Sequence, residues 1–399
     1  MALDISKVTR AVNALGESAA TYAKELNDRL ALARATFNAI AADPAELTRI
    51  ADEVSRKFRW AGAIPTRETI NGAFPLPQRP ARFNVIAADG SQIYPDRHGI
   101  ALYYLINVGS IVFRHGLSDA PSTASLPEVF FEDEDLYYEE ENSLITTEMI
   151  NANRDVRELG ELARLTKIEA ASAPTTALLD NSLLLYISLR EQNPKFSREV
   201  IEKYLAHLDV LRSSGAVVAG VVDRPRSANL IRLLNLSTLG PDEITQENLH
   251  GVGKQFKHVT DSTLFHVLKP GERSALFVLA SPANIEKYEP RGHKTYFFFL
   301  NTGRPSKNAI LRIEVPEWVA TDSEKLNLVH AAIVEQCKAS GGFPYVLMRA
   351  HELAVVTAPE RRAFDEMVTG SLIRNRVPAS LSQKQQGKAW TGSGRRRYR

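Results

Sequence analysis

The sequence contains one cysteine, no long apolar run and neither of two common hydrolase motifs. Cys337 alone excludes a disulfide within the chain and a structural zinc site built from several thiolates. No apolar stretch approaches the roughly 18 residues of a membrane span, and the start, MALDISKVTR, lacks the pattern of a signal peptide. These absences predict a cytoplasmic protein.

The missing motifs narrow the chemistry further. Neither GxSxG, typical of serine hydrolases, nor HExxH, typical of zinc proteases, occurs. The stretch HGVGKQFK resembles a phosphate-binding loop, but it lacks the first glycine at the required spacing. In addition, Gln255 stands where a serine or threonine would bind Mg²⁺, so we exclude an ATPase of this class.

The chain also lacks a strong net charge, because it has 49 basic and 47 acidic residues. The balance is uneven along the chain, since Arg374 to Arg399 holds eight basic residues and no acidic one. A basic tail on a mildly acidic body indicates a polyanionic partner. The alternative is a solvated, disordered tail without a partner.

What is present is an ordinary globular composition, with 44% hydrophobic and 24% charged residues over 399 positions. Helical spacing of Ala and Leu predicts a helical region over residues 1–65, and Pro65 and Pro75–Pro80 indicate a linker. Strands then alternate with helices, which predicts an α/β fold with a mixed sheet covered by helices on both faces. An RNase H-like arrangement is one fold of this kind. The expected strands end at 89, 180, 223, 280, 301 and 315, and the main expected helices cover 146–170, 197–215, 227–236 and 323–342.

The stretch FNVIAADGSQ allows two interpretations. Asp89-Gly90 is a strong hairpin signal, so a turn is the first. The second is a metal-binding carboxylate at a strand end, with Gly90 leaving room for a ligand. The next apolar stretch, broken at Gly109-Ser110, predicts two further strands of a meander, and we expect the acidic segment 127–142 to be a solvated face.

The same pattern returns in TTALLDNSL, where Asp180 ends a second buried strand and is followed by a small residue and a serine. Ligands of open α/β sheets bind outside strand ends. Two adjacent carboxylates repel unless a cation such as Mg²⁺ or Mn²⁺ lies between them. Two unrelated Asx turns are the alternative. A third carboxylate would come from the preceding helix, from one of these residues: Asp155, Glu158 or Glu161.

Four segments occur in an order that resembles the NurA family over about residues 80–370: IAADGS, LLDNSL, VAGVVDRPRSANLIRLL and FPYVLMRAHELAVV. The resemblance implies an RNase H-like core over 80–370, a Mn²⁺-dependent (or Mg²⁺-dependent) nuclease site, a homodimer, and docking on HerA, a hexameric DNA-translocating ATPase. The helical region 1–65 and a basic, disordered tail over 374–399 would flank this core.

The resemblance also assigns residues. Asp89 and Asp180 match the two metal aspartates, although the family more often has glycine where this chain has Asn181. Glu161 fits the spacing of the family's glutamate, about five helical turns before the second aspartate, with Glu158 as the alternative. His351 matches the C-terminal histidine of the site; by itself it would be read as an ordinary core or surface histidine. Candidate phosphate-binding residues are Arg224, Arg226, Lys254 and Lys257.

The implied function is a metal-dependent deoxyribonuclease that processes DNA ends with a HerA-like ATPase, in double-strand-break repair or phage defence. It would act as a 5′–3′ exonuclease, a single-strand endonuclease or both. Asp89, Glu161 and Asp180 would hold the metal, and His351 would complete the catalytic set. Two alternatives are an RNase H-like nuclease acting on RNA and a nonenzymatic nucleic-acid-binding regulator of an ATPase.

Overall fold

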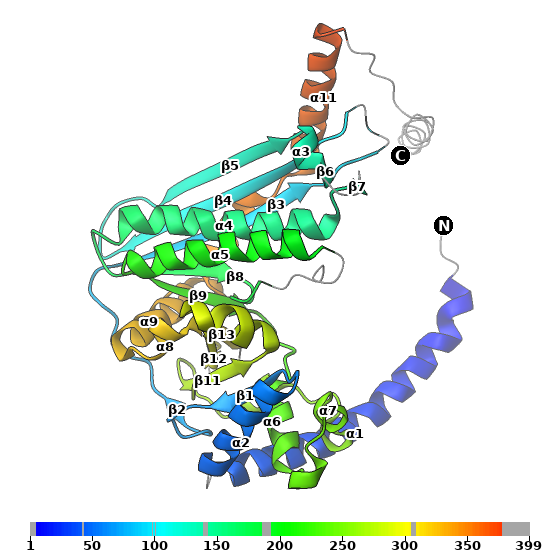
Figure 1. Ribbon diagram of the computed structural model, residues 1–399, viewed down its shortest axis with the longest axis vertical. Helices are drawn as coiled ribbons and strands as arrows, with labels where there is room; N and C mark the ends of the chain where they lie inside the picture. Colours follow the sequence, from blue (N-terminus) through cyan, green and yellow to red (C-terminus); the bar gives the residue numbers. More distant parts are fainter. Residues whose placement is uncertain are drawn as a thin grey trace. The chain divides into compact units, whose positions relative to one another are not determined.

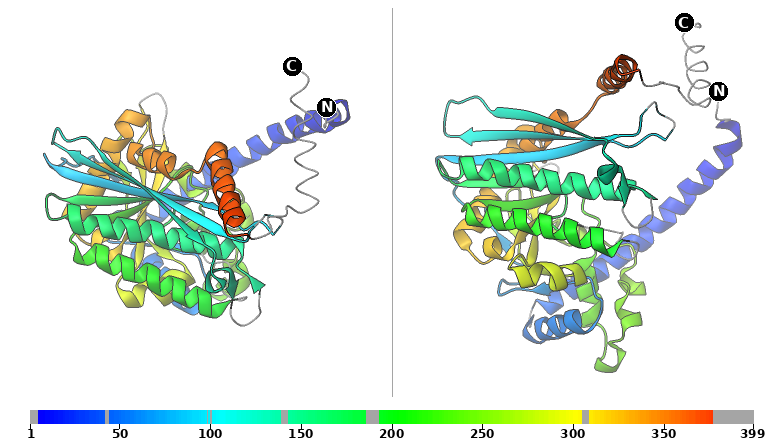
Figure 2. Two further views of the ribbon diagram at one scale, coloured as in Figure 1. Left: turned by 90° about the horizontal axis from the view of Figure 1, so that it is seen from above. Right: turned by 45° about the horizontal axis from the view of Figure 1, so that its top comes forward.

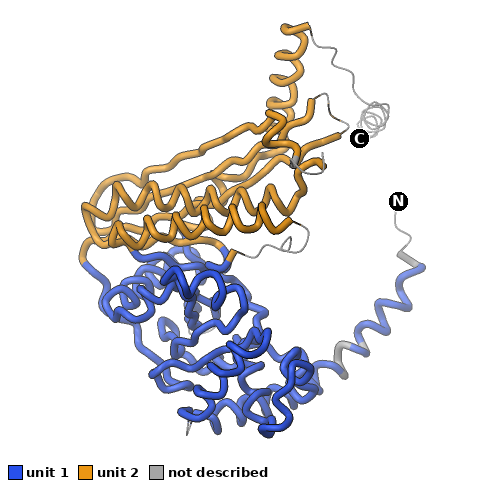
Figure 3. The backbone as a smooth tube through the Cα atoms, in the orientation of Figure 1, with its two compact units in different colours: residues 1–80, 181–184, 217–345 blue, residues 81–180, 185–216, 346–399 orange. Residues whose placement is uncertain are grey.

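The computed structural model describes residues 5–41, 44–97, 99, 101–138, 143–185, 193–304 and 309–376. The chain forms two compact units, and each is assembled from separate stretches (Figure 3). Unit 1 comprises Met1–Pro80, Asn181–Leu184 and Val217–Tyr345, and unit 2 comprises Ala81–Asp180, Leu185–Ala216 and Val346–Arg399. Within the described ranges, no helix is both long enough and apolar enough to cross a bilayer.

Unit 2 contains a four-stranded mixed arrangement in the order β8-β3-β4-β5, in which β3 and β8 are parallel and the other pairs antiparallel. Its strands are β3 (Phe83–Ile93), β4 (Tyr104–His115), β5 (Ser122–Phe130) and β8 (Thr175–Asp180), with a small β6 (Tyr137–Tyr138) and β7 (Ser143–Leu144) pair. Its helices are α3 (Asp133–Leu136), α4 (Thr147–Glu169), α5 (Pro194–Ser213), α10 (Tyr345–Ala354) and α11 (Ala358–Arg374). Helices α4 and α5 run side by side along the strands (Figures 1 and 2).

The ends of α4 and α5 follow from local sequence. Thr146 caps α4 by accepting a hydrogen bond from the backbone N–H of Met149. Asn193 caps α5 in the same way, and Pro194 occupies its first position, where a missing N–H costs nothing. After α5, Gly215 adopts a φ of +76°, which is the usual left-handed stop. These elements therefore lie where the sequence predicted them.

The predicted hairpin at Asp89-Gly90 is wrong, and so is the expectation that the strand ends at Asp89. Strand β3 continues to Ile93 and pairs with β4 without interruption, with Asp89 opposite Gly109. Likewise, β4 is one strand through Gly109, and the third strand of the meander is β5, which takes in the first residues of the segment expected to be a solvated acidic face. Gly90 and Gly109 both lie in extended strands, and α4 and α10 pack against them too closely for a side chain to fit.

Unit 1 contains an antiparallel array in the order β1-β11-β12-β13-β9, with β2 and β10 joined at its side. Pro65, which we expected in a linker, ends strand β1 opposite Phe277. The strands are β1 (Gly62–Pro65), β2 (Ala73–Phe74), β9 (Val217–Val222), β10 (Arg273–Ser274), β11 (Phe277–Ala280), β12 (Thr295–Asn301) and β13 (Ile310–Pro316). The longer helices are α1 (Thr9–Ile40), α2 (Pro44–Lys57), α6 (Asn229–Ser237) and α9 (Ser323–Ser340), joined by the short α7 (Gln246–Leu249) and α8 (Glu317–Ala320).

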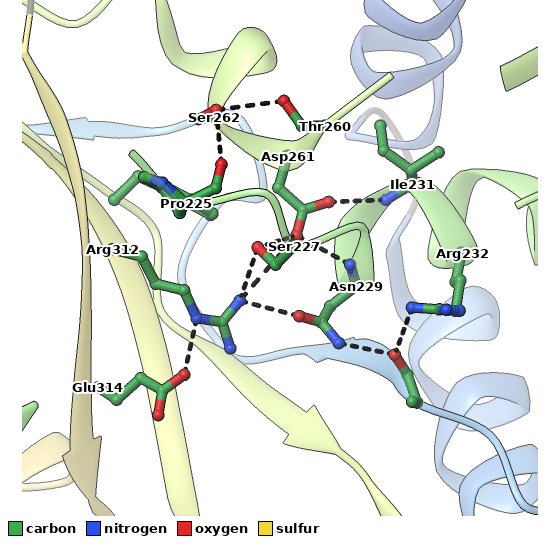
Figure 4. Close-up of polar contacts among 12 residues, drawn as sticks. Pro225, Ser227, Asn229, Ile231, Arg232, Thr260, Asp261, Ser262, Arg312 and Glu314 are labelled. Atoms are coloured by element: carbon green, nitrogen blue, oxygen red, sulfur yellow. Dashed lines mark hydrogen bonds and ion pairs between the residues drawn. The ribbon is translucent and has the colours of Figure 1, made fainter. Parts of the chain in front are cut away.

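A buried polar network fixes the loop between β9 and α6 (Figure 4). Asp261 is fully buried and accepts hydrogen bonds from the backbone N–H groups of Asn229 and Ile231, so it caps α6 from a distance. It also accepts from the hydroxyl of Ser227. Arg312, only 2% exposed, donates to Asn229 and to that hydroxyl. Buried charges persist only when paired in this manner, and the loop is therefore held rigidly.

The predicted fold class is confirmed, because helices flank strands of both directions and a helical region precedes them. The division into 1–65, 80–370 and 374–399 stays a prediction. Of the basic tail, only Arg374 and Arg376 carry a described structure; its six other basic residues lie outside the described residues.

Candidate active site

Strand pairing places Asp89 and Asp180 next to each other. In the parallel pair of β3 and β8, the last register partners are Ala88 and Leu179, and each aspartate follows one of them directly. Neighbouring strands lie about 4.8 Å apart, and equivalent positions point to the same face. The two carboxylates therefore lie next to each other where the pairing of β3 with β8 ends, although β3 itself continues to Ile93. Asn181, which follows, has a φ of 151°, which explains why a glycine suits this position in the family pattern.

His351 is brought to the first of these carboxylates by helix α10. Its Nδ1 lies 2.7 Å from Oδ2 of Asp89, while Oδ1 of Asp89 accepts a hydrogen bond from the backbone N–H of Gly90. The Asp89 side chain is 16% exposed, whereas that of His351 is 63% exposed. The histidine ring is thus anchored at one nitrogen and open to a ligand elsewhere.

Glu158 approaches from the opposite face, on helix α4. Its side chain is buried, and burial raises its pKa well above the ordinary value. The negative charges of Asp155, Asp89 and Asp180 raise this pKa further, while Arg154 lowers it. The charges of Asp89 and Asp180 therefore both raise the pKa of Glu158, although Glu158 lies on a different element.

One oxygen of Glu158 is unsatisfied. Nε of Arg154 lies 3.0 Å from Oε1 of Glu158 as an ion pair, but this oxygen has no hydrogen-bond partner in the described part of the chain. Arg154 is directed elsewhere, because it donates to Asp155 and to the side chain of Gln92 on β3. The Arg154 guanidinium thus offsets the charge of this buried carboxylate without hydrogen-bonding the oxygen, so the oxygen can still accept a further cation.

Glu161 is differently placed. One of its oxygens accepts from the hydroxyl of Ser110 at 2.8 Å, and Arg164 donates to both oxygens at 2.7 and 2.8 Å. Its carboxylate is therefore fully hydrogen-bonded by groups outside the pair of aspartates. Sequence spacing favoured Glu161 over Glu158, whereas the contacts favour Glu158.

Gly90 permits the approach of α4 to the strand. A Cβ atom at this position would lie 2.6 Å from Oε1 of Glu158 and 2.6 Å from Cγ of Arg154. Any side chain would displace one of them, because such distances are well inside van der Waals contact. The Asp-Gly pair thus combines a carboxylate on one face of β3 with a gap on the other.

We expect Gly90→Ala to fold but to cleave poorly. Displacing the Glu158 carboxylate by even 1 Å would lower a rate by up to about 100-fold, and overpacking would cost about 1–3 kcal/mol of stability. Single-turnover cleavage and thermal unfolding measure the two effects. Gly16→Ala, at a position with no atom within 4 Å, is the control. Wild-type cleavage by Gly90→Ala would show that this spacing does not serve the site.

The described residues contain no group of three or more His, Cys, Asp or Glu side chains gathered closely enough to hold a metal ion. The donor set nevertheless suits one, because hard divalent cations take carboxylate oxygens, and a cation would offset the charges of Asp89 and Asp180 that help to raise the pKa of Glu158. Metal binding by these residues is accordingly a proposal.

The candidate phosphate-binding residues all belong to unit 1. Arg224 and Arg226 are exposed in the loop after β9, and they alternate with the more enclosed Pro225 and Ser227. The carbonyl of Pro225 accepts from Ser262, which anchors the loop beneath the two arginines. Arg224 has a φ of +44° and a side chain that is 92% exposed. The lysines of the set are exposed near the short 3-10 turn Lys254–Phe256; they are Lys254 and Lys257.

Comparison with known proteins gives a family. A family model described as the NurA domain matches residues 83–356, which is more than half of the chain. No curated protein matches the sequence. Among solved structures, the NurA nuclease from Sulfolobus solfataricus aligns with a TM-score of 0.44 and 13% identity over 85% of this chain and 97% of that one. The catalytic domain of human Endonuclease V aligns with a TM-score of 0.33 and 13% identity over 82% and 97%, respectively. The chain belongs to the NurA family of nucleases.

Proposed function

We propose that this nuclease hydrolyses DNA with the help of a divalent cation, Mn²⁺ or Mg²⁺, held by Asp89, Asp180 and Glu158. The register of β3 and β8 carries the proposal, because the two aspartates directly follow its last pair, Ala88 and Leu179. Oε1 of Glu158, which is ion-paired with Arg154 but not hydrogen-bonded, would supply the third ligand. When bound, the cation would activate water and stabilise charge on the leaving oxygen.

His351 has a separate role in this proposal. Its Nδ1 is held by Asp89, which fixes the ring, and its exposed side can meet the scissile phosphate. A histidine oriented by a carboxylate is suited to exchanging a proton with a phosphate oxygen or a water. Arg154, paired with Glu158 and Asp155, keeps the α4 carboxylates in place.

The DNA would contact the exposed arginines of the β9–α6 loop. Because Asp261 and Arg312 hold the loop, its backbone loses little entropy when the arginines bind a phosphate. Arginine is well suited to this task, since its planar guanidinium binds phosphate through two hydrogen bonds.

Arg224→Ala and Arg226→Ala should each weaken DNA binding with little dependence on sequence. Each lost phosphate contact should flatten the plot of log affinity against log salt by about 1 unit. Fluorescence anisotropy over a salt series measures both quantities. Lys287→Ala, an exposed lysine outside the loop, is the control. An unchanged salt slope in both arginine variants would exclude the loop as a DNA contact.

Substrate and metal can be tested in one assay. Labelled DNA and RNA of the same sequence are incubated with the full chain in Mn²⁺, in Mg²⁺ and with EDTA. We expect DNA cleavage in a metal and none with EDTA. Preferential cleavage of RNA would support the RNase H-like alternative, and activity with EDTA would contradict the metal proposal. A chain that binds DNA without cutting it would favour the nonenzymatic alternative.

We also propose that the chain acts as a homodimer together with a HerA-like hexameric ATPase. The complex would process DNA ends in the cytoplasm, in double-strand-break repair or in phage defence. The family supports this proposal. Size-exclusion chromatography with light scattering, with and without a HerA-like hexameric ATPase, tests it. A monomer that does not co-elute with the ATPase would contradict both parts.

A further inference from the structure

The carboxyl end of helix α10 is captured by side chains of two strands. The carbonyl oxygen of Ala354, the last residue of α10, accepts from the hydroxyl of Ser91 on β3 at 2.5 Å and from Nδ2 of Asn107 on β4 at 2.8 Å. Nδ2 of Asn107 also lies 3.4 Å from the carbonyl oxygen of Leu353. The last carbonyls of a helix have no partner within the helix, so these two donors satisfy groups that otherwise need water.

Helix α10 packs directly against β4 at Gly109. A Cβ atom there would lie 2.4 Å from the backbone nitrogen of Ala354 and 2.7 Å from the carbonyl oxygen of Ala350. Both atoms are backbone, so a side chain could not be accommodated by a rotamer change. Gly109 is the register partner of Asp89, which places this packing contact beside the carboxylate that His351 contacts.

The amide of Asn107 has one orientation. Its Oδ1 accepts from the hydroxyl of Ser125 on β5 at 2.9 Å, so its NH₂ group must face α10. The side chain is only 6% exposed, and it spans from the edge strand to the helix. Asn107 therefore links three elements through hydrogen bonds at both ends of one amide.

We propose that Asn107 is a positioning residue: it holds α10 so that His351 faces Asp89. Ser91 and the close packing of α10 on Gly109 contribute to the same effect. His351 lies three residues before the captured carbonyl of Ala354, so a shift of the helix end moves the ring directly. The inference rests on the proposed function only for its effect on cleavage. The contact between His351 and Asp89 exists whether or not the chain cuts DNA.

Asn84 provides a matched control within the same unit. It is 2% exposed on β3, and its Nδ2 donates to the carbonyl oxygen of Glu169, the last residue of α4, at 3.1 Å. Asn84→Ala thus removes a buried amide that captures the end of a helix, as Asn107→Ala does, but five positions from Asp89 along the strand. Ser91→Ala is a milder second variant, because it removes the other donor to Ala354 and leaves a smaller gap.

The first measurement is the NMR signal of the His351 ring in full-length protein carrying ¹³C-labelled histidine, assigned by its loss in His351→Ala. We expect Asn107→Ala and Ser91→Ala to move this signal toward its position in Asp89→Asn, and Asn84→Ala to leave it in place. A His351 signal that stays in place in both variants while Asp89→Asn moves it would overturn the proposal. This measurement needs no nuclease activity, so it separates failure of the inference from failure of the proposed function.

The second measurement is single-turnover cleavage at saturating DNA and Mn²⁺. Asn107→Ala should lower the rate about tenfold or more in the wild-type background and less than about threefold in the His351→Ala background, because residues that act through one another are not additive. Equal losses in both backgrounds would mean that Asn107 acts only on stability, which contradicts a positioning role.

Discussion

Asp89→Asn and Asp180→Asn should each abolish metal-dependent cleavage, with a loss of about 1,000-fold or more, because one remaining strand-end carboxylate neither binds nor orients a divalent cation. Asparagine keeps the shape of the side chain but removes its charge. Since Asp89 also contacts His351, its replacement disturbs two groups at once. Single-turnover cleavage over a Mn²⁺ series measures the loss.

Asp223→Asn is the matched control for this pair. Asp223 follows β9, so it is also a strand-end aspartate, and it is exposed. It should keep wild-type cleavage at saturating DNA. If either Asp89→Asn or Asp180→Asn cleaves at the wild-type rate with Mn²⁺, the metal site lies elsewhere in the chain.

Glu158→Gln should lower cleavage by about 100-fold or more, whereas Glu161→Gln should affect mainly stability. Glu158 has the unsatisfied buried oxygen and the electrostatic coupling to both aspartates. Glu161 is bound by Ser110 and by Arg164; the glutamine amide keeps one acceptor oxygen, and water can satisfy the exposed Arg164, so the change should cost about 1 kcal/mol.

The two glutamates are three residues apart on one helix, so each variant is the control for the other. Cleavage rates and thermal unfolding are measured for both. A folded Glu161→Gln that loses more activity than Glu158→Gln would restore the choice made from sequence spacing.

The sequence by itself determined most of the helices and strands, and with them the two aspartates of the site. Strand β8 is apolar until Asp180, and α4 has a capping threonine and an amphipathic pattern, so both are determined by local chemistry. The residues of α10 that precede and include His351 were found by their resemblance to a family. Each of these signals depends on neighbours in the chain.

Tertiary structure decided how Asp89-Gly90 and Gly109-Ser110 are used. Both pairs are turn signals locally, yet both lie in unbroken strands, because α4 packs on Gly90 and α10 on Gly109. The sequence gives no sign of this, since the atoms that occupy the missing Cβ positions come from residues more than 60 positions away.

The same reason separates Glu158 from Glu161. Spacing along a helix shows that the two share a face, but it does not show which carboxylate meets Ser110 and Arg164 and which is left with an unsatisfied oxygen. Asn107 was missed for a related reason, because a lone asparagine in an apolar strand has no local signature. Its role arises only when β4, β5 and α10 are brought together, and hydrogen bonds across elements depend on packing that no local pattern encodes.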